Sequence, residues 1–374
     1  MRIAIFTDTF LPQVNGVVTS TVKLAKKLAD RGHIIHIIAP KFEKKVRFNY
    51  PGIHVRRVVG IKAGFYEDFK LTPLLNPLLY NYIKRNNIDV FHFQTPMNLG
   101  FEAFLLARFF KKPLIGTFHT FFADKEYLKH CGLRSEVFER LAWTYATFFY
   151  NLPDVVTSPS RETKRELVRQ GCRVPIKIIS NGIGSQFDNS RSERVRKKYD
   201  RGGLMLVFVG RLAHEKNHFF LMDVMREIYE KDPSIVLLMV GDGPQKDEIK
   251  ARAPKNVIFL GSIKHDAFVR SGILGACDVF CTASKTENQP VSIMEAQANG
   301  LACVGPRAKG ISDLIKHKKN GLLVKPDSKR GFVNAILSLR DEKYRKQLSE
   351  GARVTIKEHD MDKVADCWEK VYKG

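Results

Sequence analysis

The chain has 374 residues, of which 44% are apolar and 27% are charged. These values are typical of globular proteins and exclude disorder, collagen and coiled coil, while the length suits two domains of roughly 150–200 residues each. The 62 Lys and Arg residues outnumber the 39 Asp and Glu residues, which gives a formal net charge of +23. An excess of this size predicts an anionic partner: nucleic acid, an anionic membrane surface or phosphorylated ligands.

The charge excess is spread along the chain, with 28 basic against 15 acidic residues up to Ser190 and 34 against 24 after it. No stretch approaches the roughly 18 uninterrupted apolar residues of a spanning helix. The opening MRIAIFTDTF resembles a strand that runs into a loop rather than a signal peptide or an anchor. The six cysteines form no CxxC pair. Cys277 and Cys281 lie in the strand-like run ACDVFCTAS, where cysteine acts as a small apolar residue. We expect a protein of the reducing cytosol.

The first half of the chain alternates apolar runs of strand length with segments of helical periodicity. Strands are predicted at 2–7, 34–40, 90–94, 113–120 and 155–160. Helices are predicted at 17–32, 99–110 and 161–171, and the first and third of them end at a glycine. Strand–helix alternation of this kind predicts parallel βαβ units.

The second half repeats the alternation. Strands are predicted at 204–210, 234–243, 256–263, 277–284, 302–307 and 321–324, with helices between them and a helical segment at 352–373. A Gly/Asn/Ser-rich and then basic stretch at 182–203 is typical of an interdomain linker. The sequence therefore predicts an α/β protein of two doubly wound, Rossmann-like domains that face each other across a cleft. We expect these domains at 1–187 and 188–355, with a C-terminal helix at 356–374 that packs back on the first domain.

Ligands of doubly wound folds bind beyond the carboxyl ends of the strands, so the loops that follow strands are the candidates for chemistry. In DTFLPQVNGVV, Gly16 precedes a helix, where a glycine lets backbone amides approach a phosphate. The alternative is a simple turn glycine. In GRLAHEKN, Arg211 and Lys216 offer a planar fork and a point charge, which suit a diphosphate. The alternative is a solvated surface loop.

The segment TENQPVSIMEAQANG at 286–300 combines two kinds of binding group. Pro290 suits the first position of a helix that ends at Gly300, so Glu287 lies just outside the helix and Glu295 lies on its second turn. Carboxylates accept hydrogen bonds from sugar hydroxyls, and the amides from about Gln289 to Ser292 favour an anion. His119, at the end of a predicted strand, is a further candidate, although a lone histidine is more often a surface or core residue.

Several segments in this order resemble the retaining glycosyltransferases of family 4, which have the GT-B fold. They are FTDTFLPQVNGVVTS, FHFQTP, GTFHT, SPSRETKRELVRQG, SNGI, GRLAHEK, VGDGP, FLGSI, TENQPVSIMEAQANG with its E-x7-E spacing, and KGISDLIKHKKNGLLVKP. The resemblance covers essentially the whole chain. It is strongest to the branch that includes diacylglycerol glucosyltransferases and related lipid glycosyltransferases, on the basis of NGVVTS, QTP and FHT.

The resemblance implies a role for each candidate residue. Gly16 would approach the donor diphosphate and sugar, Arg211 and Lys216 would hold the diphosphate, and Glu287 would bind hydroxyls of the transferred sugar. Glu295 would bind the ribose, His119 would contact the sugar near the reacting carbon, and Ile263 would meet the base through its backbone. The catalytic set is thus His119, Arg211, Lys216 and Glu287, and the donor site also includes Asn288, Gln289, Pro290 and Val291.

The family needs no divalent metal and no other cofactor, because protein cations and helix amides replace the metal. The D-x-D at Asp360 and Asp362 we interpret as a helix start. The family commonly has a glycine two or three residues after the first glutamate of E-x7-E, whereas this chain has Asn288-Gln289-Pro290. Proline removes a backbone donor. This departure leaves the donor sugar open, with UDP-glucose expected first and GDP-mannose second.

The acceptor side is predicted from aromatic and basic composition. Residues 101–150 hold ten of the 26 phenylalanines, including Phe121 and Phe122, and 143–150 is apolar and aromatic. This favours a lipid groove or membrane-facing surface, with helix core as the alternative. The basic segment 41–57 suits anionic headgroups, with a solvated hairpin as the alternative. We expect a peripheral enzyme at the inner face of the plasma membrane that glycosylates a lipid such as diacylglycerol.

Other functions stay open at this point. A soluble or polysaccharide acceptor, a nucleotide-sugar epimerase and a glycogen-type phosphorylase are compatible with the same fold, because a fold does not fix a function. A phosphorylase would need a cofactor-anchoring lysine environment, which we do not identify. The non-enzymatic alternative is a basic nucleic-acid-binding protein, but the sequence lacks a recognisable binding motif or one concentrated basic helix. No nucleic-acid partner is therefore expected.

Overall fold

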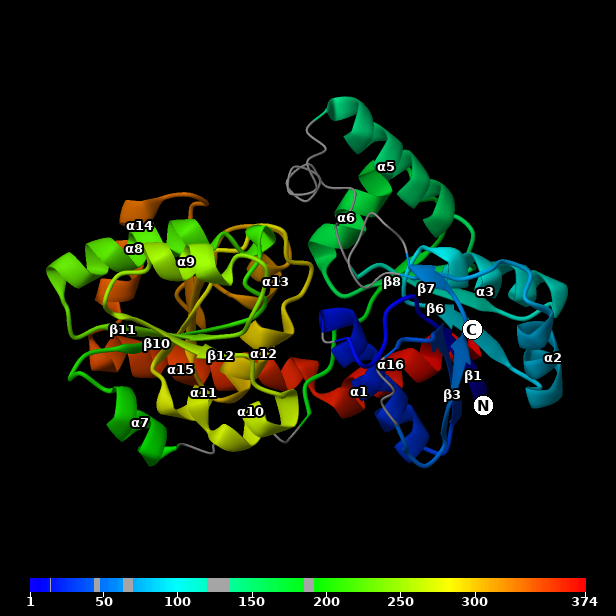
Figure 1. The fold of residues 1–374 in the computed structure, drawn as a ribbon, viewed down its shortest axis with the longest axis horizontal. Coiled ribbons are helices and arrows are strands. Elements are labelled where there is room, and N and C mark those ends of the chain that lie inside the picture. The colour runs from blue at the N-terminus through cyan, green and yellow to red at the C-terminus, as the bar shows by residue number, and fades with distance from the viewer. Residues whose placement is uncertain (14, 44–47, 63–69, 120–134, 185–191) are drawn as a thin grey trace. The chain divides into compact units, whose positions relative to one another are not determined.

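The computed structural model describes residues 1–13, 15–43, 48–62, 70–119, 135–184 and 192–374. The described chain folds into two compact units (Figure 1). Residues 1–119, 135–182 and 361–374 belong to the first unit, and the second is built from residues 183–360. The chain thus enters the second unit after residue 182 and returns to the first after residue 360. The domain break expected at 187/188 lies outside the described residues.

The first unit is built on a parallel sheet with the strand order β3-β2-β1-β6-β7-β8-β9. Its strands are β1 (Arg2–Phe6), β2 (Ile34–Pro40), β3 (Ile53–Val58), β6 (Val90–Phe93), β7 (Leu114–Thr117), β8 (Val155–Ser158) and β9 (Ile176–Ile178). A small antiparallel pair, β4 (Ile61–Lys62) and β5 (Lys70–Leu71), lies apart from it. The strands expected at 2–7, 34–40, 90–94, 113–120 and 155–160 are confirmed, that at 34–40 with identical bounds and the others with ends that shift by one to three residues.

Helices cover both faces of this sheet, as the apolar residues of β1 require. Ala4 and Phe6 contribute to one core, and Ile3 and Ile5 contribute to the other. The helices are α1 (Gly16–Asp30), α2 (Pro77–Asn86), α3 (Asn98–Phe109), α5 (Glu136–Tyr150), α6 (Arg161–Arg169) and α16 (Met361–Lys373). The cores place α2, α3, α5 and α6 on one face and α1 and α16 on the other.

One connection is described only in part. β3 runs parallel to β2, with Ile53 beside Ile35, and Tyr50 forms an isolated antiparallel bridge with Ile53. The alternative of a hairpin at 41–57 therefore stays a prediction. Residues 44–47 of this connection lie outside the described residues.

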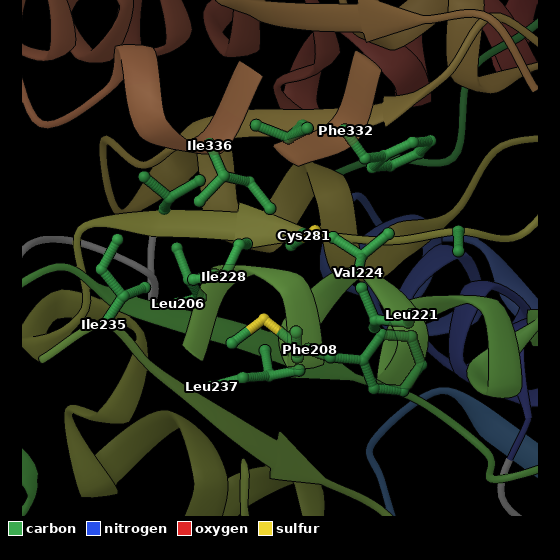
Figure 2. Close-up of a cluster of buried hydrophobic side chains, with 14 of the residues drawn as sticks. Leu206, Phe208, Leu221, Val224, Ile228, Ile235, Leu237, Cys281, Phe332 and Ile336 are labelled. Atoms are coloured by element: carbon green, nitrogen blue, oxygen red, sulfur yellow. The ribbon is translucent and has the colours of Figure 1, made fainter. Parts of the chain in front are cut away.

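The second unit repeats the architecture with the strand order β12-β11-β10-β13-β14-β15, all parallel. The strands are β10 (Met205–Val209), β11 (Val236–Val240), β12 (Val257–Gly261), β13 (Val279–Cys281), β14 (Ala302–Pro306) and β15 (Gly321–Val324). Figure 2 shows one of its cores, in which Leu206 and Phe208 of β10 meet Leu221, Val224 and Ile228. The predicted pair of doubly wound α/β sheets is confirmed.

The helical elements of the second unit follow the strands in turn. They are α7 (Glu193–Tyr199), η2 (His214–Lys216), α8 (His218–Lys231), α9 (Lys246–Arg252), α10 (His265–Ser271), α11 (Ile273–Ala276), α12 (Val291–Ala298), α13 (Ile311–Leu314), α14 (Lys329–Ser338), α15 (Glu342–Ile356) and η3 (Lys357–His359). Met205 and Val207 of β10 point into a second core, which also holds Ile293 and Met294 of α12.

One expectation about a connecting segment is corrected, and another is refined. The linker expected at 182–203 contains α7, which belongs to the second unit because Arg196 donates to the Asp278 carboxylate at 2.7 Å. The segment 352–373 is helical, as expected, but it is divided, since α15 ends at Ile356 and α16 begins at Met361. The break lies where the chain leaves the second unit, and there the Ile183 amide donates to the carbonyl of His359.

The described cysteines agree with the apolar interpretation. Cys172, Cys277, Cys281 and Cys303 are buried free thiols, and Cys367 is an exposed one, whereas Cys131 lies outside the described residues. Burial raises the pKa of Cys281 to about 12, so this thiol stays protonated. Cys277 and Cys281 therefore act as core residues, as predicted.

Candidate functional site

The strand order of the second unit reverses direction between β10 and β13, which are neighbours in the sheet. Such a switch point separates the loops that leave the carboxyl ends of two adjacent strands, and ligands of doubly wound folds bind there. Here the two loops are 210–217, after β10, and 282–290, after β13. They carry Arg211, Lys216 and Glu287, three of the four residues predicted to be catalytic.

The loop 210–217 is held by its neighbours on both sides. The Leu212 amide donates to the carbonyl of Asp242, and the Leu212 carbonyl accepts from Gln245, both at 3.0 Å. On the other side, Ser284 Oγ donates to the carbonyl of Glu215 at 3.0 Å. The contact with the loop after β11 is close, because a Cβ on Gly241 would lie 1.8 Å from the carbonyl oxygen of Gly210. The backbone that carries Lys216 is therefore fixed before any ligand arrives.

Lys216 and Glu287 meet across the switch point. The Lys216 ammonium donates to Glu287 Oε1 in an ion pair whose side chains are 21% and 19% exposed. Burial disfavours the charge on Lys216, but the Glu287 carboxylate outweighs this cost and the pKa of the ammonium is raised. The Lys216 ammonium is thus kept charged beside the Glu287 carboxyl group, at the place where the fold binds ligands.

The loop 286–290 leads into α12 and is buried against a neighbouring turn. Pro290 occupies the N-cap position of α12, one residue before the first helical position where we expected it. The first amides of any helix lack intrahelical acceptors and attract anions, so those of Val291 and Ser292 are the candidate phosphate donors. Asn288 and Gln289 are buried. The Gly310 amide donates to the carbonyl of Glu287 at 3.0 Å, which fixes the loop.

Glu295 lies on the second turn of α12, as predicted, but it has a partner that sequence reasoning missed. His265, the first residue of α10, approaches Glu295 Oε1 with Nε2 at 2.9 Å. Ile263 lies two residues before His265, in the loop after β12, and packs partly buried against the core. Ile263, the candidate contact for the nucleotide base, and His265, the partner of Glu295, therefore lie in the same short segment.

Arg211 occupies a different position from Lys216 in the same loop. Its residue is exposed, and its carbonyl accepts from Nε2 of the buried His218 at 3.0 Å. The backbone at this position is thus anchored while the guanidinium reaches solvent. A side chain of this kind can reorient to meet an arriving diphosphate.

The first unit has its own switch point, between β1 and β6. Asp8, just after β1, accepts from Thr95 Oγ1 at 2.7 Å and from the Leu99 amide at 3.1 Å, so it ties the two loops together. Complete burial raises the pKa of Asp8 to about 6, despite these hydrogen bonds. Asp8 was missed by sequence reasoning, although a carboxylate directly after a buried strand was visible.

His119 follows β7 and belongs to a buried polar chain. Its Nε2–H donates to Gln94 Oε1 at 2.5 Å, and the Gln94 amide nitrogen lies 2.9 Å from His92 Nε2. The other ring nitrogen of His92 lies 2.8 Å from the hydroxyl of Tyr372, on α16. Burial lowers the pKa of His119 to about 4 and that of His92 to about 3, so both rings are neutral near pH 7. The motif FHFQTP, which contains Gln94, was singled out in the sequence, but no role was predicted for Gln94.

Gly16 is the first residue of α1, whose N-cap Asn15 accepts from the Val18 amide at 2.9 Å. A Cβ placed on Gly16 would meet nothing within 4 Å, so the backbone there faces open space. Ser20 of the same helix lines a small cavity together with His119 and Gln94. The first unit thus brings His119 and the start of α1 to the same side of its sheet.

The predicted D-x-D has a structural explanation. Asp362 lies in the first turn of α16 and pairs with Lys27 at 2.6 Å and Arg31 at 3.2 Å. Within the described ranges, no three His, Cys, Asp or Glu side chains are grouped so as to hold a metal ion. Over the same ranges, no helix combines the length and the apolar character needed to cross a bilayer.

The aromatic segment predicted to form an acceptor groove or a helix core contains both buried and exposed aromatic residues. Trp143, Phe149 and Tyr150 of α5 are buried, whereas Tyr145 and Phe148 are exposed. Phe121 and Phe122 lie outside the described residues.

Comparison with known proteins gives matches along almost the whole chain. Residues 14–187 match the model of Glycosyltransferase Family 4, and residues 189–355 match that of Glycosyl transferases group 1. A GDP-mannose-dependent alpha-mannosyltransferase of Corynebacterium glutamicum is 30% identical over 332 residues, which cover 87% of this chain and 76% of the relative. An alpha-monoglucosyldiacylglycerol synthase of Streptococcus pneumoniae is 26% identical over 86% of this chain and 75% of its own length.

A solved structure shares the fold at low sequence identity. The crystal structure of Anabaena HepE in complex with UDP and glucose superposes with a TM-score of 0.78 at 17% identity, over 100% of this chain and 99% of that one. The two parallel-sheet units described above are therefore those of a known class of two-domain enzymes.

Proposed function

The chain belongs to glycosyltransferase family 4 and has the GT-B fold, and from that premise we propose a specific reaction. The protein moves a hexose from a nucleotide-sugar onto a hydroxyl of a membrane lipid such as diacylglycerol, with retention of the anomeric configuration. Residues 1–187 bind the acceptor and residues 188–355 bind the donor. The proposed donor is UDP-glucose, and GDP-mannose is the competing one, because a 30% identical relative is named for it.

The observation that carries the proposal is the Lys216–Glu287 pair beside the N-terminus of α12. A nucleotide-sugar presents a diphosphate next to a ring of hydroxyls, and the site presents a cation and helix amides next to a carboxylate. Lys216 and the α12 amides suit the diphosphate, while Glu287 suits the hydroxyls. In this proposal Glu295, with His265, binds the ribose, and Ile263 meets the base.

The proposed mechanism follows from where charge develops. As the anomeric bond breaks, negative charge grows on the departing diphosphate, and fixed cations and dipoles aimed there lower the barrier. Lys216, Arg211 and the α12 amides serve this purpose without a divalent metal. The acceptor hydroxyl attacks the anomeric carbon from the face that the diphosphate leaves, which gives retention, and its proton passes to an oxygen of the departing diphosphate. His119, neutral and held by Gln94, contacts the sugar near the reacting carbon.

The lipid acceptor and the alpha product draw support from the relatives. The Streptococcus pneumoniae relative is named for a glucosylated diacylglycerol, and both relatives are named for alpha linkages. GDP-mannose carries its sugar through an alpha-anomeric phosphate bond, so an alpha product of that donor corresponds to retention. The proposed location of the enzyme is the inner face of the plasma membrane.

A product assay with paired donors tests the proposal. The protein is incubated with radiolabelled UDP-glucose or GDP-mannose and mixed micelles of diacylglycerol, and the organic phase is analysed for glycolipid. We expect labelled lipid from one donor, with an alpha linkage by NMR. Label found only in an epimerised nucleotide-sugar, a sugar phosphate or a soluble glycoside would overturn the lipid assignment. Oligonucleotide binding without nucleotide-sugar binding would overturn the enzyme assignment of this site.

A further inference from the structure

Helix α5 of the first unit presents a stripe of apolar side chains to solvent. Its core side is formed by Trp143, Ala146, Phe149 and Tyr150. On the other side, large apolar residues remain between 42% and 64% exposed, namely Val137, Phe138, Leu141, Tyr145 and Phe148. Their spacing of three and four residues places them along one face of the helix. Scattered exposed apolar residues are normal, but a continuous stripe marks an interaction surface.

The neighbouring helix α6 is basic. Its sequence RETKRELVR includes four cationic residues, Arg161, Lys164, Arg165 and Arg169. With Val168 and Ile178 they line a shallow groove between α6 and β9. Arg165 and Arg169 form ion pairs with Glu162 and Glu166 on the same helix, and both guanidinium side chains remain about three-quarters exposed, at 77% and 73%. The groove therefore has an apolar floor and a cationic rim.

The two helices meet at their carboxyl ends, in green in Figure 1. Thr147 Oγ1 of α5 donates to the carbonyl of Gln170 at 3.0 Å, and the Arg173 amide donates to Asn151 Oδ1 at 2.7 Å. The helix with the apolar stripe and the helix with the basic groove are therefore held together by fixed contacts.

The stripe also lies next to the carboxyl edge of the first sheet. The hydroxyl of Tyr145 donates to the carbonyl of Pro96 at 2.6 Å, and Pro96 belongs to the loop that follows β6. Gln94, in the same loop, holds His119. A partner seated on α5 is thus close to the loop that orients the candidate catalytic histidine.

We propose that the exposed face of α5 and the basic groove of α6 together dock this protein on an anionic phospholipid bilayer. Val137, Phe138, Leu141, Tyr145 and Phe148 enter the headgroup boundary, and the α6 cations bind lipid phosphates. This assignment rests on the proposed function, because a lipid acceptor must be taken from a membrane.

Charge complementarity selects the bilayer as the occupant. Apolar side chains beside a basic strip are the composition of interfacial helices, and each Lys or Arg near an anionic membrane strengthens binding. The whole chain has a net charge of +23, so an acidic surface also attracts it over a longer range.

Vesicle flotation tests the surface with the full chain. The probes are vesicles of phosphatidylcholine alone and vesicles of equimolar phosphatidylcholine and phosphatidylglycerol, at low and high salt. We expect flotation with the anionic vesicles at low salt and its loss in high salt, because salt screens exposed charges. Failure to float with anionic vesicles at low salt would overturn the proposal.

Matched variants test which residues make the contact. Leu141→Gln with Phe148→Gln removes two apolar side chains but keeps good helix formers. Its control is Leu78→Gln with Val354→Gln, on α2 and α15, where exposure is similar, 67% and 59% against 59% and 58%. We expect about tenfold weaker vesicle binding for the α5 variant, from the apolar area it removes, and unchanged binding for the control. Equal effects of the two variants would overturn the assignment to α5.

The basic groove has its own matched pair. Arg165→Gln removes a cation that is 77% exposed and pairs with Glu162, and Lys346→Gln removes one that is 75% exposed and pairs with Glu342 on α15. We expect roughly fivefold weaker binding to anionic vesicles for Arg165→Gln and no change for Lys346→Gln. The same loss in both would mean that net charge alone attracts the protein, which would overturn the role of α6.

Transfer to diacylglycerol in mixed detergent micelles separates this proposal from the proposed function. Since micelles bypass docking on a bilayer, we expect the α5 variant and Arg165→Gln to transfer sugar in micelles at the rate of the unaltered protein. Loss of vesicle binding in the α5 variant, with no transfer by any form of the protein, would leave the docking surface standing and refute the lipid glycosylation. Vesicle binding untouched by the α5 variant, with transfer intact, would refute the docking surface alone.

Discussion

Replacing Lys216 by Met separates catalysis from stability, because the chain offers a comparison ion pair at the other end of β13. Lys216 pairs with Glu287, which follows β13, whereas Arg196 pairs with Asp278, which precedes β13, and also with Asp200. The side chains are 21% and 19% exposed in the first pair and 21% and 15% exposed in the second. Lys216→Met and Arg196→Met therefore remove one cation each from positions of equal exposure, although Arg196→Met breaks two ion pairs.

Arg196→Met is expected to lose at least as much stability as Lys216→Met, because it breaks two ion pairs, whereas only Lys216→Met is expected to lose activity. Breaking a fully buried pair costs about 3–5 kcal/mol and an exposed one about 0–1 kcal/mol, so pairs with one-fifth exposure fall near 1–3 kcal/mol. The second unit should then melt several degrees lower in both variants, at roughly 2–4 °C per kcal/mol. Only Lys216→Met also removes a fixed charge from the leaving diphosphate, and transfer should fall about 100- to 1000-fold.

The assay combines calorimetry, nucleotide binding and glycosyl transfer. UDP and GDP should bind Lys216→Met more weakly, whereas they should bind Glu287→Gln at least as well as they bind the unaltered protein, because Glu287 is proposed to hold the sugar and not the diphosphate. Transfer by Glu287→Gln should still fall. A Lys216→Met variant that melts like Arg196→Met and transfers sugar at the unaltered rate would refute the reasoning about the switch point.

Three further results are expected. Gly16→Ala should not lower the melting temperature, since a Cβ there meets nothing within 4 Å. It should reduce glycosyl transfer, because the donor is proposed to approach this backbone. Unchanged transfer would contradict that approach. Gly310→Ala should lower both stability and nucleotide binding, because its Cβ would lie 1.3 Å from a carbonyl oxygen of the 286–290 loop. Unchanged stability in calorimetry together with unchanged nucleotide affinity in titration would contradict this packing. His92 and His119 have pKa values that burial lowers to about 3 and about 4, so below pH 6.5 they bind protons mainly in the unfolded state and the melting temperature should fall. Tyr372→Phe removes a hydrogen-bond partner of His92 and should lower the melting temperature at every pH. A melting temperature that does not fall between pH 6.5 and 4 would contradict the burial of these rings.

The fold was predictable because its strands are buried on both faces. Segments such as IIHIIAP and GLLV are continuous apolar runs, and their boundaries in the structure coincide with the prediction. The short strands β4 and β5 and the helix α7 were missed, because a two-residue strand has no periodicity and α7 has a largely basic sequence with no buried residue. Parallel pairing of β3 was also missed, since its alternating sequence IHVRRV suits a hairpin equally well.

The candidate site was only partly predictable. The position after a strand was enough to select Lys216 and Glu287, and the ion pair between them depends on the strand order, which sequence alone does not supply. The partners of other candidates are long-range contacts that no local pattern marks: His265 beside Glu295, and Gln94 beside His119. Their assigned roles toward a donor stay predictions.

The return of the chain to the first unit has a consequence for biosynthesis. Trp368 and Tyr372 of α16 close the core that contains Ile3 and Ile5 of β1. During translation, residues 361–373 leave the ribosome only after the whole second unit, so the first strand made must wait for the last helix. The described elements of the second unit, from α7 to η3, lie in one continuous stretch and can fold earlier. The core of the first unit around Ile3 and Ile5 can therefore be completed only after the second unit has been synthesised.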